Sequence, residues 1–116
     1  MTAVFVGIGA MAGGLLRYGL TVWVQSLWTI AAINIVGSFL LGLLTHLSAP
    51  LRPELQHALG AGLLGGFTTF STFTVQTLLE ADVGRTGRAV AYVLISVLGG
   101  LVAAAAGYLL GRVLSA

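Results

Sequence analysis

The sequence alternates four long apolar stretches with three short polar segments. The apolar stretches cover about residues 3–25, 28–47, 55–79 and 89–111. Each is as long as the roughly 20 residues that an α-helix needs to cross about 30 Å of hydrocarbon. The connecting segments contain residues that end membrane helices, with two prolines and an arginine in 50–53 and mixed charges in 80–88. The pattern therefore predicts an all-α, multi-pass membrane protein with a single transmembrane domain over residues 1–116.

Composition supports this fold class and narrows the range of partners. Hydrophobic residues make up 58% of the 116 residues and charged residues only 7%, a balance that is atypical of soluble domains. The absence of cysteine excludes disulfides and thiolate metal sites. The basic residues are all arginines, and they form no stripe that a nucleic acid would need. We expect the protein to lie in the cell inner or plasma membrane, in contact with the lipid bilayer, and to have no nucleic-acid partner.

The arginines give no clear signal for one orientation in the membrane. One side would carry Arg52 and Arg112, and the other side Arg85 and Arg88. The fifth arginine, Arg17, lies inside the first span. Positive charge near the span ends normally sets the orientation, and here the two sides are balanced. We therefore predict dual topology, in which a second copy inserts the opposite way and pairs as an antiparallel homodimer. We interpret Arg17 as a structural charge rather than as an anion ligand.

The third apolar stretch contains the least helical sequence of the four. Residues 65–73 read Gly-Gly-Phe-Thr-Thr-Phe-Ser-Thr-Phe, which combines poor helix formers with hydroxyl groups. We expect the third helix to break within this segment, near the membrane midplane, because the segment lies at the centre of its span. Non-helical backbone survives in lipid only where it is buried in protein or lines a cavity. Because transporters place ions at such breaks, this segment is the candidate site.

The polar side chains at this depth are hydrogen-bond donors, and none is an acid. They include Asn34 in the second span, Thr69, Ser71 and Thr72 in the third, and Tyr92 and Ser96 in the fourth. A proton-coupled pump normally needs a carboxylate or a histidine inside the membrane, whereas this set can replace water around a small anion. Phe70 and Phe73 lie on one helical face, and the edge of a phenyl ring carries the positive end of its quadrupole. The pattern indicates a pathway for an anion.

A broken helix would also leave backbone carbonyls without partners in the segment from Gly65 to Thr68. If two third helices crossed at a two-fold axis, two such carbonyls from each copy would surround one point, where a hard monovalent cation would fit. Buried waters, or the hydroxyls of Thr69 and Thr72, are the alternative partners for these carbonyls.

Together these residues resemble the Fluc (CrcB) family of fluoride channels over the whole chain. The resemblance rests on Gly13-Gly14-Leu15-Leu16-Arg17-Tyr18 in the first span, Asn34 in the second and the 65–73 run in the third. It implies an antiparallel dual-topology dimer with two fluoride pores, each built from both subunits, and a structural sodium ion at the dimer centre. By position it also implies pore roles for Phe70, Phe73, Asn34, Tyr92 and Ser96, and sodium ligation by the carbonyls of Gly65 and Thr68.

The predicted function is passive, fluoride-selective efflux from the cytoplasm, which protects the cell against fluoride, with no enzyme activity. The alternative is a small multidrug-resistance-type four-helix exporter, which would need a glutamate that the first span lacks. A non-conducting assembly subunit would leave the hydroxyl cluster without a role. Many members of the resembled family carry Glu where this chain has Gln76, so the conduction rate and the choice between an identical partner and a paralogue stay open.

Overall fold

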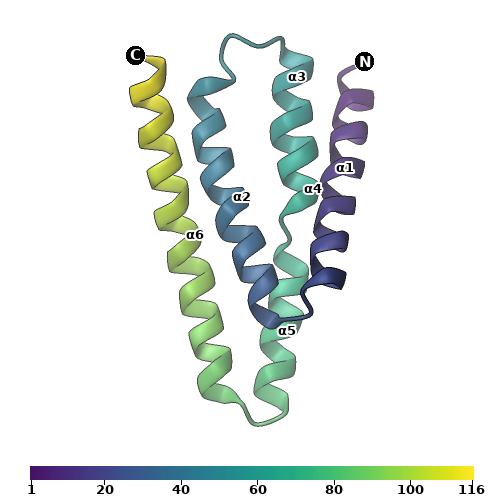
Figure 1. The fold of residues 1–116 in the computed structure, drawn as a ribbon, viewed down its shortest axis with the longest axis vertical. Helices are drawn as coiled ribbons and strands as arrows, with labels where there is room; N and C mark the ends of the chain where they lie inside the picture. The colour runs from purple at the N-terminus through teal and green to yellow at the C-terminus, as the bar shows by residue number, and fades with distance from the viewer.

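The computed structural model describes residues 1–116 and contains helices and turns without any strand (Figure 1). Four helical segments are long and apolar enough to cross a membrane. They are α1 (Thr2–Trp23), α2 (Leu27–Leu47), a third segment over Pro53–Asp82, and α6 (Thr86–Ser115). The third segment consists of α3 (Pro53–His57), the π-helix η1 (Ala58–Leu64), α4 (Gly65–Phe67) and α5 (Phe70–Asp82). The prediction of an all-α protein with four spanning helices is confirmed.

The ends of the helices follow from the residues that cap them. Ser26 begins α2, where its hydroxyl accepts a hydrogen bond from the amide of Trp28 at 3.3 Å. Pro53 lies in the first turn of α3, where a missing amide donor is tolerated. Gly84 turns the chain between α5 and α6 with a φ of 85°, a conformation that glycine adopts readily. The third and fourth segments are longer than the apolar stretches because both helices continue into polar residues such as Glu80.

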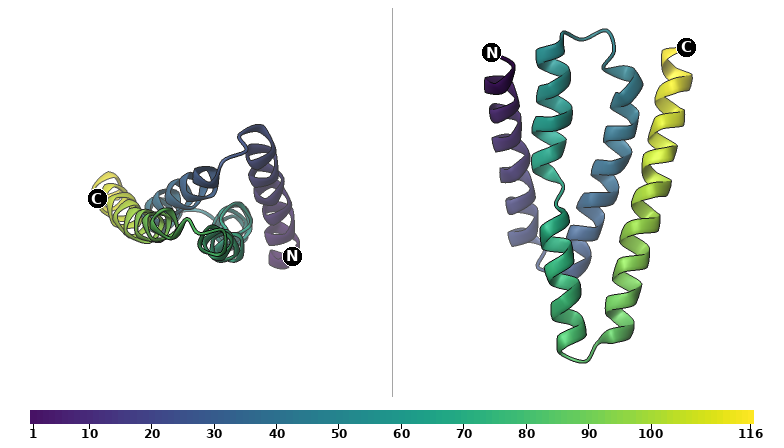
Figure 2. Two further views of the ribbon diagram at one scale, coloured as in Figure 1. Left: turned by 90° about the horizontal axis from the view of Figure 1, so that it is seen from below. Right: turned by 180° about the vertical axis from the view of Figure 1, so that it is seen from behind.

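The four segments stand side by side, with both chain termini at the same end of the molecule (Figure 1). Along the bundle, α2 packs against α6, α1 packs against η1 and α4, and α5 packs against the first part of α6. The view from behind shows the same order, with α1 and α6 at the two outer edges (Figure 2). The hairpin between α5 and α6 extends beyond the turn that joins α1 to α2. The loop after α2 therefore lies at the end that carries the termini, and the other two connections lie at the opposite end.

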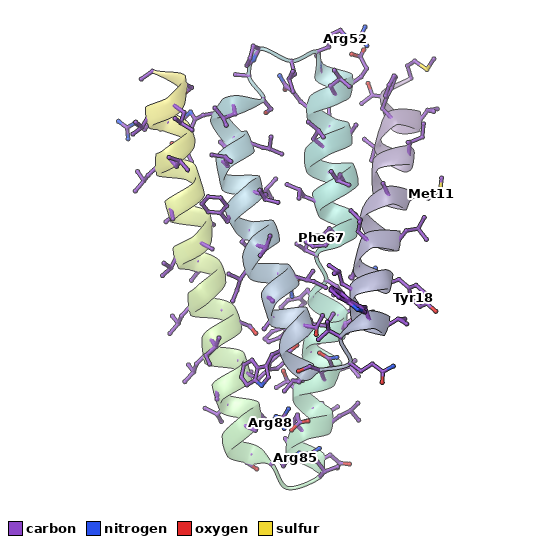
Figure 3. All side chains as sticks on the ribbon, in the orientation of Figure 1. Met11, Tyr18, Arg52, Phe67, Arg85 and Arg88 are labelled. Atoms are coloured by element: carbon purple, nitrogen blue, oxygen red, sulfur yellow. The ribbon has the colours of Figure 1, made fainter.

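A glycine allows α1 to approach the third segment at backbone distance. A Cβ atom on Gly13 would overlap the carbonyl oxygen of Leu63 and lie 2.8 Å from the amide nitrogen of Phe67. Small residues at such positions are the usual way in which helices pack closely in lipid. Phe67 lies beside α1 near the middle of the bundle (Figure 3). Gly13 therefore fixes the third segment at the residue where α4 ends.

The bundle buries few of its own residues. Only 14 of the 116 residues are buried. The buried apolar cluster consists of Ile30, Ala31, Ile33, Phe73 and Tyr92. Large apolar side chains on the outside, such as Met11 and Tyr18 of α1, point away from the other helices (Figure 3). An apolar surface of this extent promotes association in water, whereas lipid tails are themselves apolar. The protein is a multi-pass membrane protein whose outer surface suits lipid.

Candidate functional site

The helical path of the third segment is interrupted at Thr68 and Thr69. Thr68 has φ and ψ of −85° and 158°, and Thr69 has −151° and 125°, so both residues are extended. The helix resumes at Phe70 because the hydroxyl of Thr69 accepts a hydrogen bond from the amide of Thr72 at 3.3 Å and caps α5. The non-helical part is therefore shorter than the whole 65–73 run. It lies midway along the third segment (Figure 1).

Asn34 of α2 holds Thr69 in this extended conformation. The Asn34 Nδ2 donates to the carbonyl oxygen of Thr69, and the Asn34 Oδ1 accepts from the amide of Thr69, each at 2.8 Å. The two bonds resemble the paired bonds between neighbouring β-strands, with a side chain in place of one strand. Because a side-chain amide carries two donor hydrogens, one hydrogen of Nδ2 remains for a ligand.

Backbone carbonyls on the N-terminal side of the interruption lose their helical partners, and those of Gly65 and Thr68 are among them. In an α-helix each carbonyl accepts from the amide four residues later. The amide of Thr69 bonds Asn34 instead of the carbonyl of Gly65, and the amide of Thr72 bonds the Thr69 hydroxyl instead of the carbonyl of Thr68. No hydroxyl of the neighbouring threonines donates to either carbonyl. Gly65 and Thr68, the residues predicted as sodium ligands, thus offer neutral oxygens of the type that hard cations accept.

The two phenylalanines at the start of α5 have very different surroundings. Phe73 is 7% exposed, whereas Phe70 is 75% exposed. Their ring centroids are 5.9 Å apart, and the ring of Phe73 also packs against Tyr92 at 5.2 Å. The ring of Tyr92 in turn packs edge to face against the ring of Trp28, with the centroids 5.6 Å apart. Packing from three helices therefore fixes Phe73, while Phe70 projects from the single chain.

A cavity of about 800 Å³ lies between α2, the third segment and α6. Its wall contains most of the predicted site residues, namely Asn34, Gly65, Thr68, Thr69, Phe70, Phe73 and Ser96. The hydroxyl oxygen of Ser96 is buried and has no hydrogen-bond partner within the chain. No carboxylate lines the cavity, and its one titratable side chain is His57. The wall therefore contains amide and hydroxyl donors and phenyl rings without a negative charge, which suits an anion.

Three of the predicted pore residues do not line this cavity. Tyr92 is fully buried, and its hydroxyl donates to the Oε1 of Gln76 at 2.7 Å. The hydroxyl of Ser71 lies 3.3 Å from that of Thr69, and Thr72 accepts a bond of the same length from Thr69. Tyr92 thus packs against the ring of Phe73 without lining the cavity. The pore roles of Tyr92, Ser71 and Thr72 stay predictions.

The arginines lie mainly at the two ends of the bundle. At the α5–α6 hairpin, Glu80 pairs with Arg85 at 2.9 Å and with Arg88 at 3.6 Å. Arg52 lies at the opposite end (Figure 3). Arg17 is half-buried on α1, forms no ion pair and does not line the cavity. Its role as a structural charge stays a prediction.

Sequence reasoning missed two residues of the site. Gly37 lies one turn after Asn34, and a Cβ atom there would overlap the Cγ2 methyl of Thr68. The spacing of Asn34 and Gly37 in one span was the available signal, because it places both on the same helix face. His57 lines the cavity one turn before Ala61.

Comparison with known proteins identifies the family of this chain. A family model described as "CrcB-like protein, Camphor Resistance (CrcB)" matches residues 4–108. A protein of Thermus thermophilus named fluoride-specific ion channel FluC is 42% identical over an alignment of 117 positions, which covers 94% of this chain and 92% of that protein. A relative with the same name from Stutzerimonas stutzeri is 43% identical, with 92% of this chain and 94% of the relative covered. A relative from Moorella thermoacetica named fluoride-specific ion channel FluC 2 is 42% identical, with 94% of this chain and 95% of the relative covered. The resemblance predicted from the sequence is confirmed, and this chain belongs to the CrcB-like (Fluc) family.

Proposed function

We propose that this protein is a fluoride-selective channel in the inner membrane of a bacterium, where it lets fluoride leave the cytoplasm passively. The observation that carries the proposal is the cavity at the interrupted helix, whose wall combines Asn34, Ser96, Phe70 and Phe73 without a carboxylate. Relatives that cover 94% and 92% of this chain are named fluoride-specific ion channels. The protein acts as a channel and not as an enzyme, and it confers fluoride resistance.

The chemistry of the cavity fits a small and strongly hydrated anion. Amide and hydroxyl hydrogens, together with the positively polarised edges of phenyl rings, replace the water that the ion leaves behind. Hydrogen fluoride enters a cell as a neutral acid and dissociates in the near-neutral cytoplasm, which traps the anion. The membrane potential drives an anion outward with about 2.3 kcal/mol per 100 mV. Neither a coupling ion nor ATP is needed.

A second, antiparallel copy completes the site in this proposal. The ring of Phe70 is 75% exposed in one copy although it lines the cavity, so a partner surface has to enclose it. The arginines are balanced between the two ends of the bundle, which favours insertion in both orientations. The carbonyls of Gly65 and Thr68 supply two oxygens from one chain, and a second chain supplies two more. A sodium ion on the two-fold axis would then be held by four carbonyl oxygens and would stabilise both interruptions.

The test is fluoride efflux from liposomes that contain the pure protein, measured with a fluoride electrode. We expect rapid efflux of fluoride and none of chloride under the same gradient. Phe70→Ile keeps the bulk of the side chain but removes the ring edge, so it should lower the fluoride flux by at least tenfold, equivalent to about 1.4 kcal/mol. Phe5→Ile on α1, which lies outside the cavity, is the matched control and should conduct normally. Equal rates for chloride and fluoride, or no fluoride efflux, would contradict the proposal.

A further inference from the structure

The hydrogen bonds of Asn34 give this side chain a second role besides contact with an anion. We propose that Asn34 is a positioning residue that creates the cation site by withdrawing a backbone amide from the carbonyl of Gly65. The inference rests on the proposed function, in which a sodium ion binds the carbonyls of Gly65 and Thr68.

The first step is the competition for one amide. In a continuous helix the amide of Thr69 would bond the carbonyl of Gly65. Instead it bonds the Oδ1 of Asn34 at 2.8 Å, and the Nδ2 of Asn34 returns a second bond of 2.8 Å to the Thr69 carbonyl. This pair of hydrogen bonds fixes the orientation of the Thr69 peptide groups. Gly65 lines the cavity wall, and its carbonyl is left to a ligand.

The second step follows from the conformation that Asn34 imposes on Thr69. An N-cap residue needs extended backbone angles, and Thr69 has them with φ of −151° and ψ of 125°. In this conformation the Thr69 hydroxyl accepts a hydrogen bond from the amide of Thr72. The carbonyl of Thr68 is therefore left without its helical partner. One side chain on α2 thus determines the state of both carbonyls, although it is far from them in the sequence.

Removal of the Asn34 amide should let the helix close over the site. Without a side-chain partner, the amide of Thr69 has no other acceptor at hand than the carbonyl of Gly65, because an unpaired backbone group in the membrane is costly. The cation would then compete with a helical hydrogen bond for the Gly65 oxygen. Sodium binding therefore weakens when Asn34 is replaced, whereas a residue that acts only on the anion would leave sodium affinity unchanged.

The experiment compares Asn34→Leu, which keeps the approximate shape, with Asn34→Asp, which keeps an acceptor but loses the donor. The control is Thr45→Val on the same helix, which removes a hydroxyl bond to the carbonyl of Leu41 at 3.1 Å outside the cavity. Sodium affinity is obtained from the thermal stabilisation of purified protein when sodium replaces a large organic cation. The backbone of Thr69 is followed by the Cα chemical shifts of isotope-labelled threonine, which distinguish extended from helical residues.

We expect Asn34→Leu to raise the sodium dissociation constant about tenfold, equivalent to about 1.4 kcal/mol, and to move the Thr69 shift toward the helical value. The sodium dissociation constant of Asn34→Asp should lie between those of Asn34→Leu and the unchanged protein. The dissociation constant of Thr45→Val should match that of the unchanged protein. An extended Thr69 with normal sodium affinity in Asn34→Leu would overturn the inference, even if fluoride efflux fell. Failure of the unchanged protein to conduct fluoride would refute the proposed function separately, since the sodium titration and the shifts do not depend on conduction.

Discussion

Gly37→Ala tests how closely α2 must approach the interruption. The added Cβ would overlap the Cγ2 methyl of Thr68, while Cδ2 of Phe67 and Cβ of Thr68 would lie at ordinary distances of 3.6 and 3.7 Å. A single methyl group is therefore the source of the clash. The Thr68 side chain cannot rotate freely to relieve it, because its hydroxyl donates to the carbonyl of Leu64 at 3.0 Å. The strain should pass to the backbone of Thr68, whose carbonyl lacks its helical partner.

Two opposing terms set the size of the effect. Overpacking by one methyl group costs about 1–3 kcal/mol, whereas replacing glycine by alanine in a helix gains about 1 kcal/mol. Gly14→Ala in α1 isolates the second term, because a Cβ atom there meets nothing within 4 Å. The difference in unfolding free energy between the two variants therefore measures the cost of the overlap. We expect Gly37→Ala to be less stable than Gly14→Ala by about 1–3 kcal/mol.

Thr68→Ser provides the rescue, because serine lacks the Cγ2 methyl but keeps the hydroxyl. The assays are thermal unfolding in detergent and fluoride efflux from liposomes, on the Gly37→Ala, Thr68→Ser and double variants. The double variant should regain most of the stability and flux lost in Gly37→Ala, which gives a coupling free energy of about 1 kcal/mol or more. Strictly additive losses would refute the assignment of the strain to this methyl group.

Three further outcomes are expected. Phe73→Ile should lower thermal stability as well as fluoride flux, whereas Phe70→Ile should lower flux alone, since Phe73 is 7% and Phe70 75% exposed; equal stabilities would contradict the difference in packing. A single cysteine introduced into the loop 82–87 should be labelled from both sides of intact cells, and labelling from one side only would exclude dual topology. Gln76→Leu should destabilise the protein by about 1–3 kcal/mol because it leaves the buried Tyr92 hydroxyl without a partner, and Tyr92→Phe in the same chain should recover most of that loss.

The sequence was informative where a single segment determines the structure. The four spans follow from the length of the apolar stretches, and the poor helix formers of residues 65–73 pointed to the segment that contains the interruption. The extent of the non-helical part could not be predicted, because it depends on Thr69 acting as the N-cap of α5. Weak helix propensity is distributed over nine residues of the run, whereas one well-placed cap restores the helix at Phe70.

Features that depend on two distant segments were not accessible in the same way. The pairing of Asn34 with Thr69 joins positions 35 residues apart, and no local pattern distinguishes this use of an asparagine from a donor to a ligand. Tyr92 shows the same limit, since its place among the polar side chains of the fourth span suggested a pore role. The structure instead places the Tyr92 hydroxyl on Gln76, a contact that depends on how α5 packs against α6. The seven-residue π-helix η1 also has no signal in composition.

The position of the two chain termini limits how a pair of these subunits can be encoded in one gene. Both termini lie at the same end of the bundle (Figure 1), so in an antiparallel pair the C-terminus of one copy and the N-terminus of the other face opposite sides of the membrane. A flexible hydrophilic linker cannot join them, because it would have to remain within the bilayer. A tandem fusion therefore needs a linker with one additional apolar helix of about 20 residues. A tandem protein joined by a short polar linker would force both halves into the same orientation and would prevent antiparallel pairing within one polypeptide.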